Sequence, residues 1–452
     1  MIPAAFRPFM EQTPLCVMAR ATLESLFQPE QLDALFRDTA QKQYQKELLF
    51  SQLVELMTSV VLRVNESVHD AYRKRADVLP VSDQAVYDKL RCMEPAVSAA
   101  LVADSASRVV SVIDALGARL APWLPGYRVQ VIDGNHLSAT QRRLRVLRQT
   151  WAAPLPGTAL AVYEPERDVV TQVFLTPDGH AQERSLLGDV LDSVQSGDLW
   201  IADRNFCTQG FLFGLAQAGA AFVLRQHGNL PFRLRGERRE CGRTDTGVVY
   251  EQAMELTHDD ATLPVRRITL ALHKPTRNGD AEIHVATNVP EGAASAAAVV
   301  ALYRKRWTIE KRFYEVTQTL DCEPNTLAYP KAALFAFSLA LVASNAAALL
   351  KASLRAAHGE QTVAEMSSHY MASEVRQTYR GMMVALPPPL WAGFAALPAS
   401  RLAEALRGMA EQVKPAFYRK TRRGPKKPRP PRDKYKNARH VSTQRLLDSQ
   451  RK

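Results

Sequence analysis

Val129-Gln130-Val131-Ile132-Asp133-Gly134-Asn135 is the stretch at which the 452-residue chain changes from a helical to a β pattern. Its apolar half predicts a strand that starts near residue 128 and ends at Asp133, and the Gly-Asn pair that follows is typical of a turn. A second stretch, Asp198-Leu199-Trp200-Ile201-Ala202-Asp203, is again an apolar strand closed by an aspartate. If the two strands are neighbours, the two carboxylates converge.

The segments around these strands predict a mixed α/β sheet with helices on its faces. The predicted order is βββαβαβ, in which functional side chains are expected at strand ends. The further predicted strands are 158–163, 169–175 and 221–224, and the predicted helices between strands are 181–194 and 210–218.

Different patterns lie on both sides of this sheet. Residues 1–120 have apolar residues at three- and four-residue spacing, which predicts an all-helical leader. Residues 228–290 are β-rich, with an Asn-Gly turn between 265–274 and 281–287, so we expect an inserted β subdomain containing a hairpin. Helices are expected again over 296–320, over 332–354 and on to about 413, interrupted by three consecutive prolines.

Charge is distributed unevenly along the chain. The whole sequence has 58 Lys and Arg against 46 Asp and Glu, and residues 414–452 alone carry 15 of the basic residues with two Asp. A neutral body with a strongly basic, Pro-rich tail indicates an anionic polymer as partner, and favours nucleic acid over a membrane. The composition of the rest, 46% hydrophobic, excludes a chain that is disordered throughout.

The five cysteines are scattered and form no C-x-x-C pair, so neither a zinc site nor a disulfide framework is indicated. A reducing, cytoplasmic location is expected. The apolar run over 332–350 approaches the length of a membrane span, but it is Ala-rich and contains Ser and Asn, so a buried helix is favoured and no membrane partner is expected.

Asp133 and Asp203 are candidate metal ligands, because carboxylate oxygens are what Mg²⁺ or Mn²⁺ requires. Two such ions can activate a water and stabilise the leaving oxygen in a phosphoryl displacement. The pair alone is a weak signal, since Asp after a strand is also common as a turn or cap residue.

A third element adds to the signal. Tyr303, Arg306 and Glu310 have the spacing i, i+3, i+7, which sets them on one helix face. An aromatic ring, a guanidinium and a carboxylate on one face suit a catalytic helix that completes a metal site and contacts phosphate. The alternative is a solvated helix with an Arg306–Glu310 ion pair of about 0.2–0.5 kcal/mol.

Together, Asp-Gly-Asn, Asp-Arg-Asn-Phe and Tyr-x-x-Arg-Trp-x-Ile-Glu resemble the DDE transposases of bacterial insertion sequences, whose signature is Tyr-x2-Arg-x3-Glu-x6-Lys. The resemblance covers about residues 128–350. It implies a ribonuclease-H-like core in which Asp133, Asp203 and Glu310 are the catalytic, metal-binding triad for two Mg²⁺ ions, with Mn²⁺ as a substitute. Tyr303 and Arg306 would then contact the phosphates of the element's ends.

The chain departs from this family pattern at two points. The position of the signature Lys is Thr317, which removes an expected phosphate contact. Some relatives hold a flipped base on a Trp in the β insertion, but this chain has no Trp between Trp200 and Trp307, which leaves Phe232 or Tyr250 as possible stacking residues.

Further DNA contacts are expected from basic residues and from one short helix. Arg142 and Arg143 belong to a cluster that either faces DNA or stays solvated, the two interpretations being equal. The helix near 82–90, with Ser82 as its cap, either reads a DNA groove or is an ordinary surface helix. The tail residues expected to bind DNA are Arg422, Arg423, Lys426 and Lys427.

The sequence thus predicts a DNA transposase that cuts element ends and transfers them to target DNA, acting on double-stranded DNA as a homodimer on the nucleoid. A nuclease without strand transfer and a non-catalytic DNA-binding derivative are the alternatives. The predicted domains are a helical DNA-binding domain (1–122), an α/β catalytic domain (123–355) with its β insertion at about 228–290, a helical C-terminal region (356–413) and a disordered basic tail (414–452).

Overall fold

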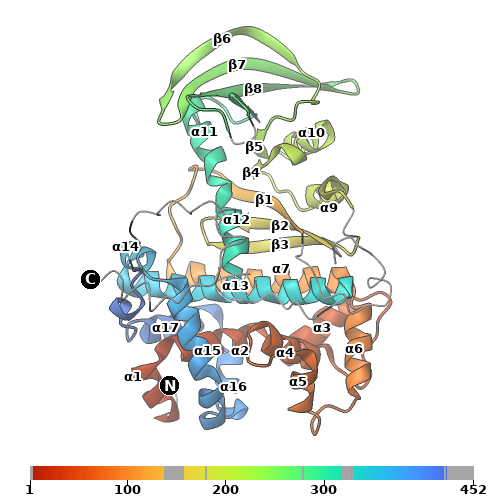
Figure 1. Cartoon of the computed structure of the whole chain (residues 1–452), viewed down its shortest axis with the longest axis vertical. Coiled ribbons are helices and arrows are strands. Elements are labelled where there is room, and N and C mark those ends of the chain that lie inside the picture. The colour runs from red at the N-terminus through yellow and green to blue at the C-terminus, as the bar shows by residue number, and fades with distance from the viewer. Residues whose placement is uncertain are drawn as a thin grey trace, which may run out of the picture. The chain divides into compact units, whose positions relative to one another are not determined.

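A nine-stranded mixed sheet and a block of helices make up the computed structural model of the chain (Figure 1), which describes residues 4–136, 157–178, 181–276, 279–316, 327, 329–421 and 424. The predicted α/β class is confirmed. The leader is helical, as predicted, and contains η1 (Ala4–Phe6), α1 (Arg7–Gln12), α2 (Pro14–Leu26), α3 (Pro29–Thr39), α4 (Phe50–Val61), α5 (Val68–Arg73), α6 (Asp83–Cys92) and α7 (Pro95–Leu116). Ser82 caps α6 by accepting a hydrogen bond from the amide of Ala85, 3.3 Å away.

The strands that carry the candidate site lie side by side in the order β3-β2-β1-β4-β5. The first three pair antiparallel, whereas β4 and β5 run parallel to β1. Their bounds are β1 (Arg128–His136), β2 (Thr158–Glu164), β3 (Val169–Thr176), β4 (Asp198–Ala202) and β5 (Ala221–Arg225). The carboxyl ends of β1 and β4 therefore meet at one edge.

Strand β1 is longer than the sequence predicts. It does not end at Asp133 but continues to His136, because the backbone from Asp133 onward pairs with β2, from Asp133 opposite Ala161 to His136 opposite Thr158. The Gly-Asn pair after Asp133 is therefore strand and not a turn.

Side chains of β1 alternate between two cores. Val129 and Val131 face the core shared with the long helices, whereas Ile132 faces a second core covered by α9 (Leu187–Leu191) and α10 (Gln209–Gln217). The second core also contains Trp200 of β4, whereas Ile201 lies in the first. The helix predicted over 181–194 is shorter than expected, consisting of the 3₁₀ turn η2 (Glu183–Leu186) and α9.

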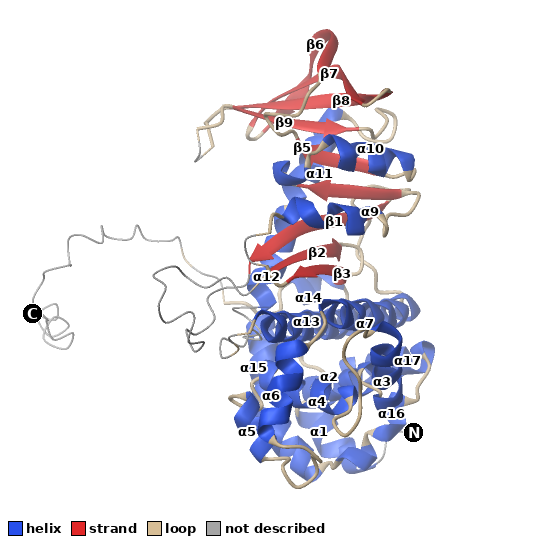
Figure 2. Cartoon of the chain, turned by 90° about the vertical axis from the view of Figure 1, so that its right-hand side faces the viewer, coloured by secondary structure: helices blue, strands red, loops and turns tan. Residues whose placement is uncertain are grey.

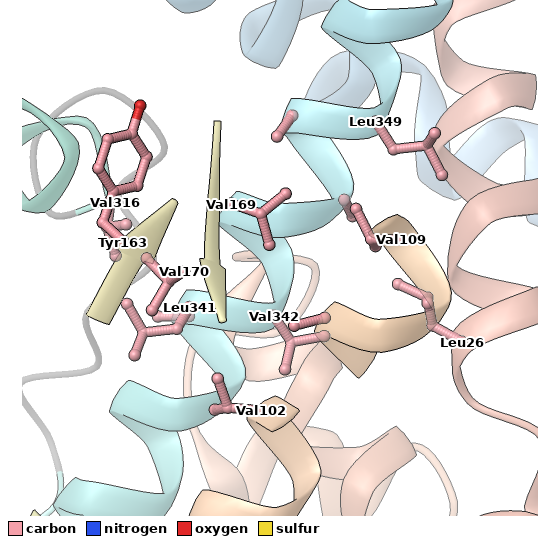
Figure 3. Close-up of a cluster of buried hydrophobic side chains, with 14 of the residues drawn as sticks. Leu26, Val102, Val109, Tyr163, Val169, Val170, Val316, Leu341, Val342 and Leu349 are labelled. Atoms are coloured by element: carbon pink, nitrogen blue, oxygen red, sulfur yellow. The ribbon is translucent and has the colours of Figure 1, made fainter. Parts of the chain in front are cut away.

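Two long helices, α7 and α13 (Pro330–His358), pack against each other and beside the edge strand β3 (Figure 2). Val102 and Val109 of α7 meet Val169 of β3 and Val342 of α13 in a buried apolar cluster (Figure 3). Full burial of each such side chain contributes about 1.5–3 kcal/mol. The leader and the C-terminal helices therefore share one core with the sheet.

Asn345 explains why a polar residue interrupts the apolar run of α13. Its amide nitrogen donates to the carbonyl of Val170 at 2.8 Å, and its amide oxygen accepts from the Val170 amide at 2.9 Å. The side chain thus satisfies the backbone amide and carbonyl of Val170 on the edge strand β3, which would otherwise be buried without partners.

The β-rich insertion extends the same sheet. Its strands are β6 (Arg233–Thr244), β7 (Gly247–His258), β8 (Ala261–Leu272) and β9 (Glu282–Thr287), and β9 pairs antiparallel with β5. The predicted hairpin is confirmed as the β8–β9 pair. The outer strand β6 is exposed, and its arginines 235, 238, 239 and 243 form ion pairs with glutamates, a charged edge that disfavours pairing with another chain.

The helix predicted over 296–320 is divided into α11 (Ala296–Lys305) and α12 (Trp307–Tyr314), which meet at Arg306. The C-terminal part contains α14 (Glu360–Ala364), α15 (Ser368–Ala385), η5 (Pro388–Leu390), α16 (Ala392–Ala395), α17 (Ala399–Ala410) and η6 (Pro415–Tyr418). By their contacts, Met1–Tyr418 form one compact unit and Arg419–Lys452 a second.

Helices α7 and α13 are each long and apolar enough to cross a membrane by length and composition alone. Most of α13 is buried inside the protein, as predicted for its apolar run, and core helices pass the same test.

Candidate active site

Arg306 is the centre of the candidate site. Its guanidinium donates to Asp133 Oδ2 at 2.8 Å and to Glu310 Oε1 at 3.1 Å. The side chain is only 6% exposed, and its Nε atom is buried without a hydrogen-bond partner. It lies at the junction of α11 and α12, so it reaches β1 on one side and its own helix on the other.

Asp133 reaches Arg306 because of strand alternation. It shares a face of β1 with Val129 and Val131, and this face looks toward the core that also contains Tyr303 of α11. Burial raises the pKa of Asp133 to about 6. Arg306 opposes this shift, whereas Glu310 and Glu183 add to it by repulsion, so burial is the main cause of the raised pKa.

Asp203 follows β4 directly, as predicted, and β4 is the neighbour of β1. The last paired residues of the two strands are Val131 and Ile201, so both aspartates lie two positions beyond that pair. Asp203 Oδ1 accepts from the amide of Arg204 at 2.7 Å and from the Tyr303 hydroxyl at 3.2 Å. Burial and Asp203 raise the pKa of Tyr303 to about 12, which keeps the phenol protonated as a donor.

The three candidate carboxylates therefore surround one buried cation. Burial disfavours the charge on Arg306, but Asp133, Asp203 and Glu310, with Tyr303, outweigh it and raise the pKa of Arg306 above its ordinary value. The structure brings together all five residues that the sequence predicts for the strand ends and the helix face. Glu310 is more open than Asp133, with 39% of its side chain exposed against 17%.

Helix α12 is fixed by a buried ion network at its far end. Arg312, 4% exposed, pairs with Asp168 in the β2–β3 turn and with Glu315 at 2.8 Å, and Lys351 of α13 pairs with Glu315 at 2.5 Å. Burial disfavours charge on Glu315, but the two cations outweigh it and lower its pKa to about 2. The helix that carries Glu310 is thereby tied to both the sheet and α13.

Residues 124–346 match the family model of the transposase DDE domain. The match covers just under half of the 452 residues, and over this part the chain is similar to transposase DDE domains. A curated protein of Sinorhizobium fredii named "Putative transposase y4zB" is 29% identical over 164 residues, which is 35% of this chain and 43% of that protein, so the match spans less than half of either. The solved structure of a piggyBac transposase synaptic complex with hairpin DNA has 10% identity, covers 87% of this chain and 84% of that chain, and gives a TM-score of 0.38, which does not establish a shared fold.

The predicted resemblance to DDE transposases is confirmed, and it points to a DNA-processing enzyme of that type. DDE transposases generally use divalent metal ions. The described residues contain no group of three or more His, Cys, Asp or Glu side chains already arranged around a metal position. The chemistry of the three carboxylates nevertheless suits a divalent metal ion. Such ions prefer hard oxygen ligands, and Asp133, Asp203 and Glu310 all interact with the same buried cation, Arg306.

Several predicted contacts lie outside the residues that the structure describes, namely Arg142, Arg143, Arg422, Arg423, Lys426, Lys427 and the signature position Thr317.

The two possible stacking residues in the insertion are both covered by arginine. The Arg238 guanidinium lies 4.0 Å from the centroid of Tyr250, and that of Arg267 lies 5.3 Å from the centroid of Phe232. A base would have to displace these cations to stack there.

Sequence reasoning missed Glu183 and the role of Asn205. Asn205 Nδ2 donates to Glu183 Oε2 at 2.5 Å, and Asn205 lies two positions after Asp203. The only signal was the Asn in Asp-Arg-Asn-Phe, because Glu183 lies in the 181–194 segment, which the sequence pattern predicts as a plain helix.

Proposed function

We propose that the chain is a transposase that cuts DNA at the ends of an insertion sequence and joins the released 3′-hydroxyl to target DNA. The observation that carries this proposal is the convergence of Asp133, Asp203 and Glu310 on Arg306 inside a transposase DDE domain. The strand order β3-β2-β1-β4-β5 supports a ribonuclease-H-like core, because Asp133 and Asp203 each lie two positions beyond the last pair of the adjacent parallel strands β1 and β4.

Asp133, Asp203 and Glu310 would hold the metal. Two Mg²⁺ ions, or Mn²⁺ in their place, would supply activation of the attacking hydroxyl and stabilisation of the leaving oxygen in each displacement. Tyr303 holds Asp203 in place through its hydroxyl, and the tether of α12 to β2–β3 and α13 keeps Glu310 beside Asp133.

Arg306 would have two partners at different stages. In the free chain it balances the carboxylates, and its planar fork is also suited to phosphate oxygens. We therefore assign it the scissile phosphate, within a homodimer that pairs two element ends.

A supercoiled plasmid that carries the gene with its native flanks tests this function. The plasmid is incubated with the full chain and Mg²⁺ or Mn²⁺, and cleavage sites and joined products are mapped by sequencing. Asp203→Ala and Glu310→Ala are compared with Glu404→Ala, which removes a carboxylate that is 66% exposed on α17.

We expect metal-dependent cuts at one boundary and joined products with the wild type and Glu404→Ala, and neither with the two site variants. Cuts without joined products would replace the proposal with a nuclease. Binding without cuts in either metal, on DNA that contains both ends, would replace it with a non-catalytic DNA-binding protein.

A further inference from the structure

A cavity of about 340 Å³ lies on the face of β1 that is opposite the Asp133 side chain. Strand alternation puts Gln130 of β1 on the same face as Ile132, and Gln130 is paired in register with Trp200 of β4. Both side chains line the cavity, which α7 and the segment after α9 also border. Its volume is within the range of about 300–1,000 Å³ that is usual for small-molecule sites.

Gln130 and Trp200 each contain a buried polar atom without a partner. Gln130 is 4% exposed and Trp200 is 1% exposed. The carboxamide oxygen Oε1 of Gln130 and the indole Nε1 of Trp200 have no hydrogen-bond partner among the described residues. One atom is an acceptor and the other a donor, and burying such groups unpaired is unfavourable. A ligand that donates to Gln130 and accepts from Trp200 would satisfy both.

The charged side chains in the lining are already neutralised. The Arg128 guanidinium donates to Asp198 at 2.7 and 3.0 Å, and Glu164 pairs with Arg167, which also pairs with Asp114. The lining residues that the structure describes therefore offer no free charge to a phosphate or a metal ion. The groups left to bind a ligand are neutral amides, hydroxyls and the indole. This favours a neutral ligand.

The apolar part of the lining and the Gln130 carboxamide together indicate the class of ligand. Ala103 and Ala106 of α7 and Val162 of β2 also line the cavity, and the short alanine side chains leave room between the helix and the sheet. Apolar surface with a few polar groups is typical of small-molecule sites. A glutamine carboxamide matches the edge of a nucleobase, since adenine presents an amino donor beside a ring-nitrogen acceptor.

We propose that this cavity binds a small neutral heterocycle of the nucleobase class, with Gln130 and Trp200 recognising its edge. A base within a DNA strand would bring phosphates to a lining whose one arginine is already paired, so a free base is favoured. The inference goes beyond the proposed DNA chemistry and does not depend on it. Gln130 and Trp200 nevertheless lie three positions before Asp133 and Asp203, on the same two strands.

Binding of adenine to the full chain tests this site. The protein is kept in chelator without DNA, so that the result is independent of metal binding and of cleavage. Saturation-transfer difference NMR detects contact with adenine, and isothermal titration calorimetry measures its affinity. Adenosine monophosphate and benzene are compared with adenine as a charged and an apolar probe.

Two variants change the cavity in different ways. Gln130→Leu removes the acceptor and keeps an apolar side chain in its place. Ala103→Phe fills part of the cavity from an exposed position on α7. Its matched control is Ala115→Phe, which adds the same side chain at an exposed position of α7 that does not line the cavity.

We expect saturable adenine binding in the wild type and Ala115→Phe, and an affinity lower by about tenfold or more in Gln130→Leu and Ala103→Phe. Adenosine monophosphate and benzene should both bind more weakly than adenine. Without adenine, the unfolding temperature of Gln130→Leu should not fall, because Oε1 has no partner in the protein to lose.

No saturable adenine binding, or equal affinity in the wild type and both cavity variants, overturns the proposal. Benzene binding as tight as that of adenine overturns it too, because the polar pair would then recognise nothing. A lower unfolding temperature of Gln130→Leu overturns the assignment of Oε1 to a ligand. If Gln130→Leu does not fold, Ala103→Phe and its control decide between the same outcomes.

Discussion

Replacing Asp133 by Asn should make the stability of the metal-free protein, relative to the wild type, rise from acid to neutral pH, and should abolish cleavage. The pKa of this carboxyl rises from its ordinary 3.8 to about 6 in the folded chain, mainly because it is buried. The folded state therefore binds the proton more tightly than the unfolded state does. Its stabilising contribution is complete below pH 3.8 and is lost as the pH rises through 6.

The size of the effect follows from the shift. At about 1.4 kcal/mol per pKa unit, a rise from 3.8 to about 6 is worth about 3 kcal/mol. Asn cannot ionise, so the Asp133→Asn variant does not lose this contribution. The free energy of unfolding of the variant relative to the wild type should increase by up to about 3 kcal/mol between pH 4 and pH 7.

Urea unfolding in chelator at several pH values measures this difference. Asp245→Asn is a matched control, because Arg304 lowers the pKa of that exposed carboxyl and the pH trend should have the opposite sign and be small. A relative stability of Asp133→Asn that stays flat or falls between pH 4 and pH 7 would refute the reasoning. Adding Mn²⁺ should then stabilise the wild type and not the variant.

Three further predictions concern the scaffold and the tail. Asn345→Leu leaves the buried amide and carbonyl of Val170 unpaired, so the free energy of unfolding in urea should fall by about 2–5 kcal/mol. Arg312→Met leaves the buried carboxylates around it without their counter-ion, and thermal and urea unfolding should detect a loss of about 3–5 kcal/mol. A chain that ends at residue 418 should unfold at the same urea concentration as the full chain, but fluorescence anisotropy should show weaker and less salt-dependent binding to duplex DNA.

Each of these has a control in the same chain. Ser344→Ala removes a buried hydroxyl that has no partner, so an equal loss in Ser344→Ala and Asn345→Leu would contradict the edge-strand explanation. Arg401→Met breaks an exposed ion pair on α17 and should change stability by at most about 1 kcal/mol. An unchanged salt slope after removal of 419–452 would contradict a DNA-binding role for the tail.

Local sequence predicted the strands and helices well, because each depends on its own apolar pattern. The bounds of β4 and the hairpin β8–β9 are examples. The failures are non-local. The sequence Gly134-Asn135 is typical of a turn. Both residues nevertheless stay in β1, because they pair with Leu160 and Ala159 of β2, which lie more than 20 positions further along the chain. The pairing of β9 with β5, which joins the insertion to the sheet, likewise depends on residues about 60 positions apart.

Those parts of the candidate site could be predicted that depend on the two-residue repeat of a strand or on the spacing of residues along a helix. Asp133 and Asp203 converge because each continues an inward-facing alternation on adjacent parallel strands, and Glu310 lies four residues from Arg306 on a helix. The position of Arg306 among all three acids required the junction of two helices, which spacing does not show. Glu183 was not predictable, since its contact with β1 depends on an empty volume at Gly134 that only the folded backbone defines.

The charge balance of the site links its stability to its chemistry. Arg306 is the buried cation among the acids, but the burial of Asp133 outweighs the attraction of Arg306 and keeps the pKa of that carboxyl above its ordinary value. A neutral residue at position 133 would avoid the stability that the metal-free protein loses when Asp133 ionises. The carboxylate is therefore not explained by folding stability. A ligand that binds only the folded chain stabilises it by an amount that grows with its concentration. A divalent cation would offset the cost of the buried Asp133 charge, so a variant without this charge should gain stability in chelator relative to the wild type as the pH rises to neutral, and should lose metal binding.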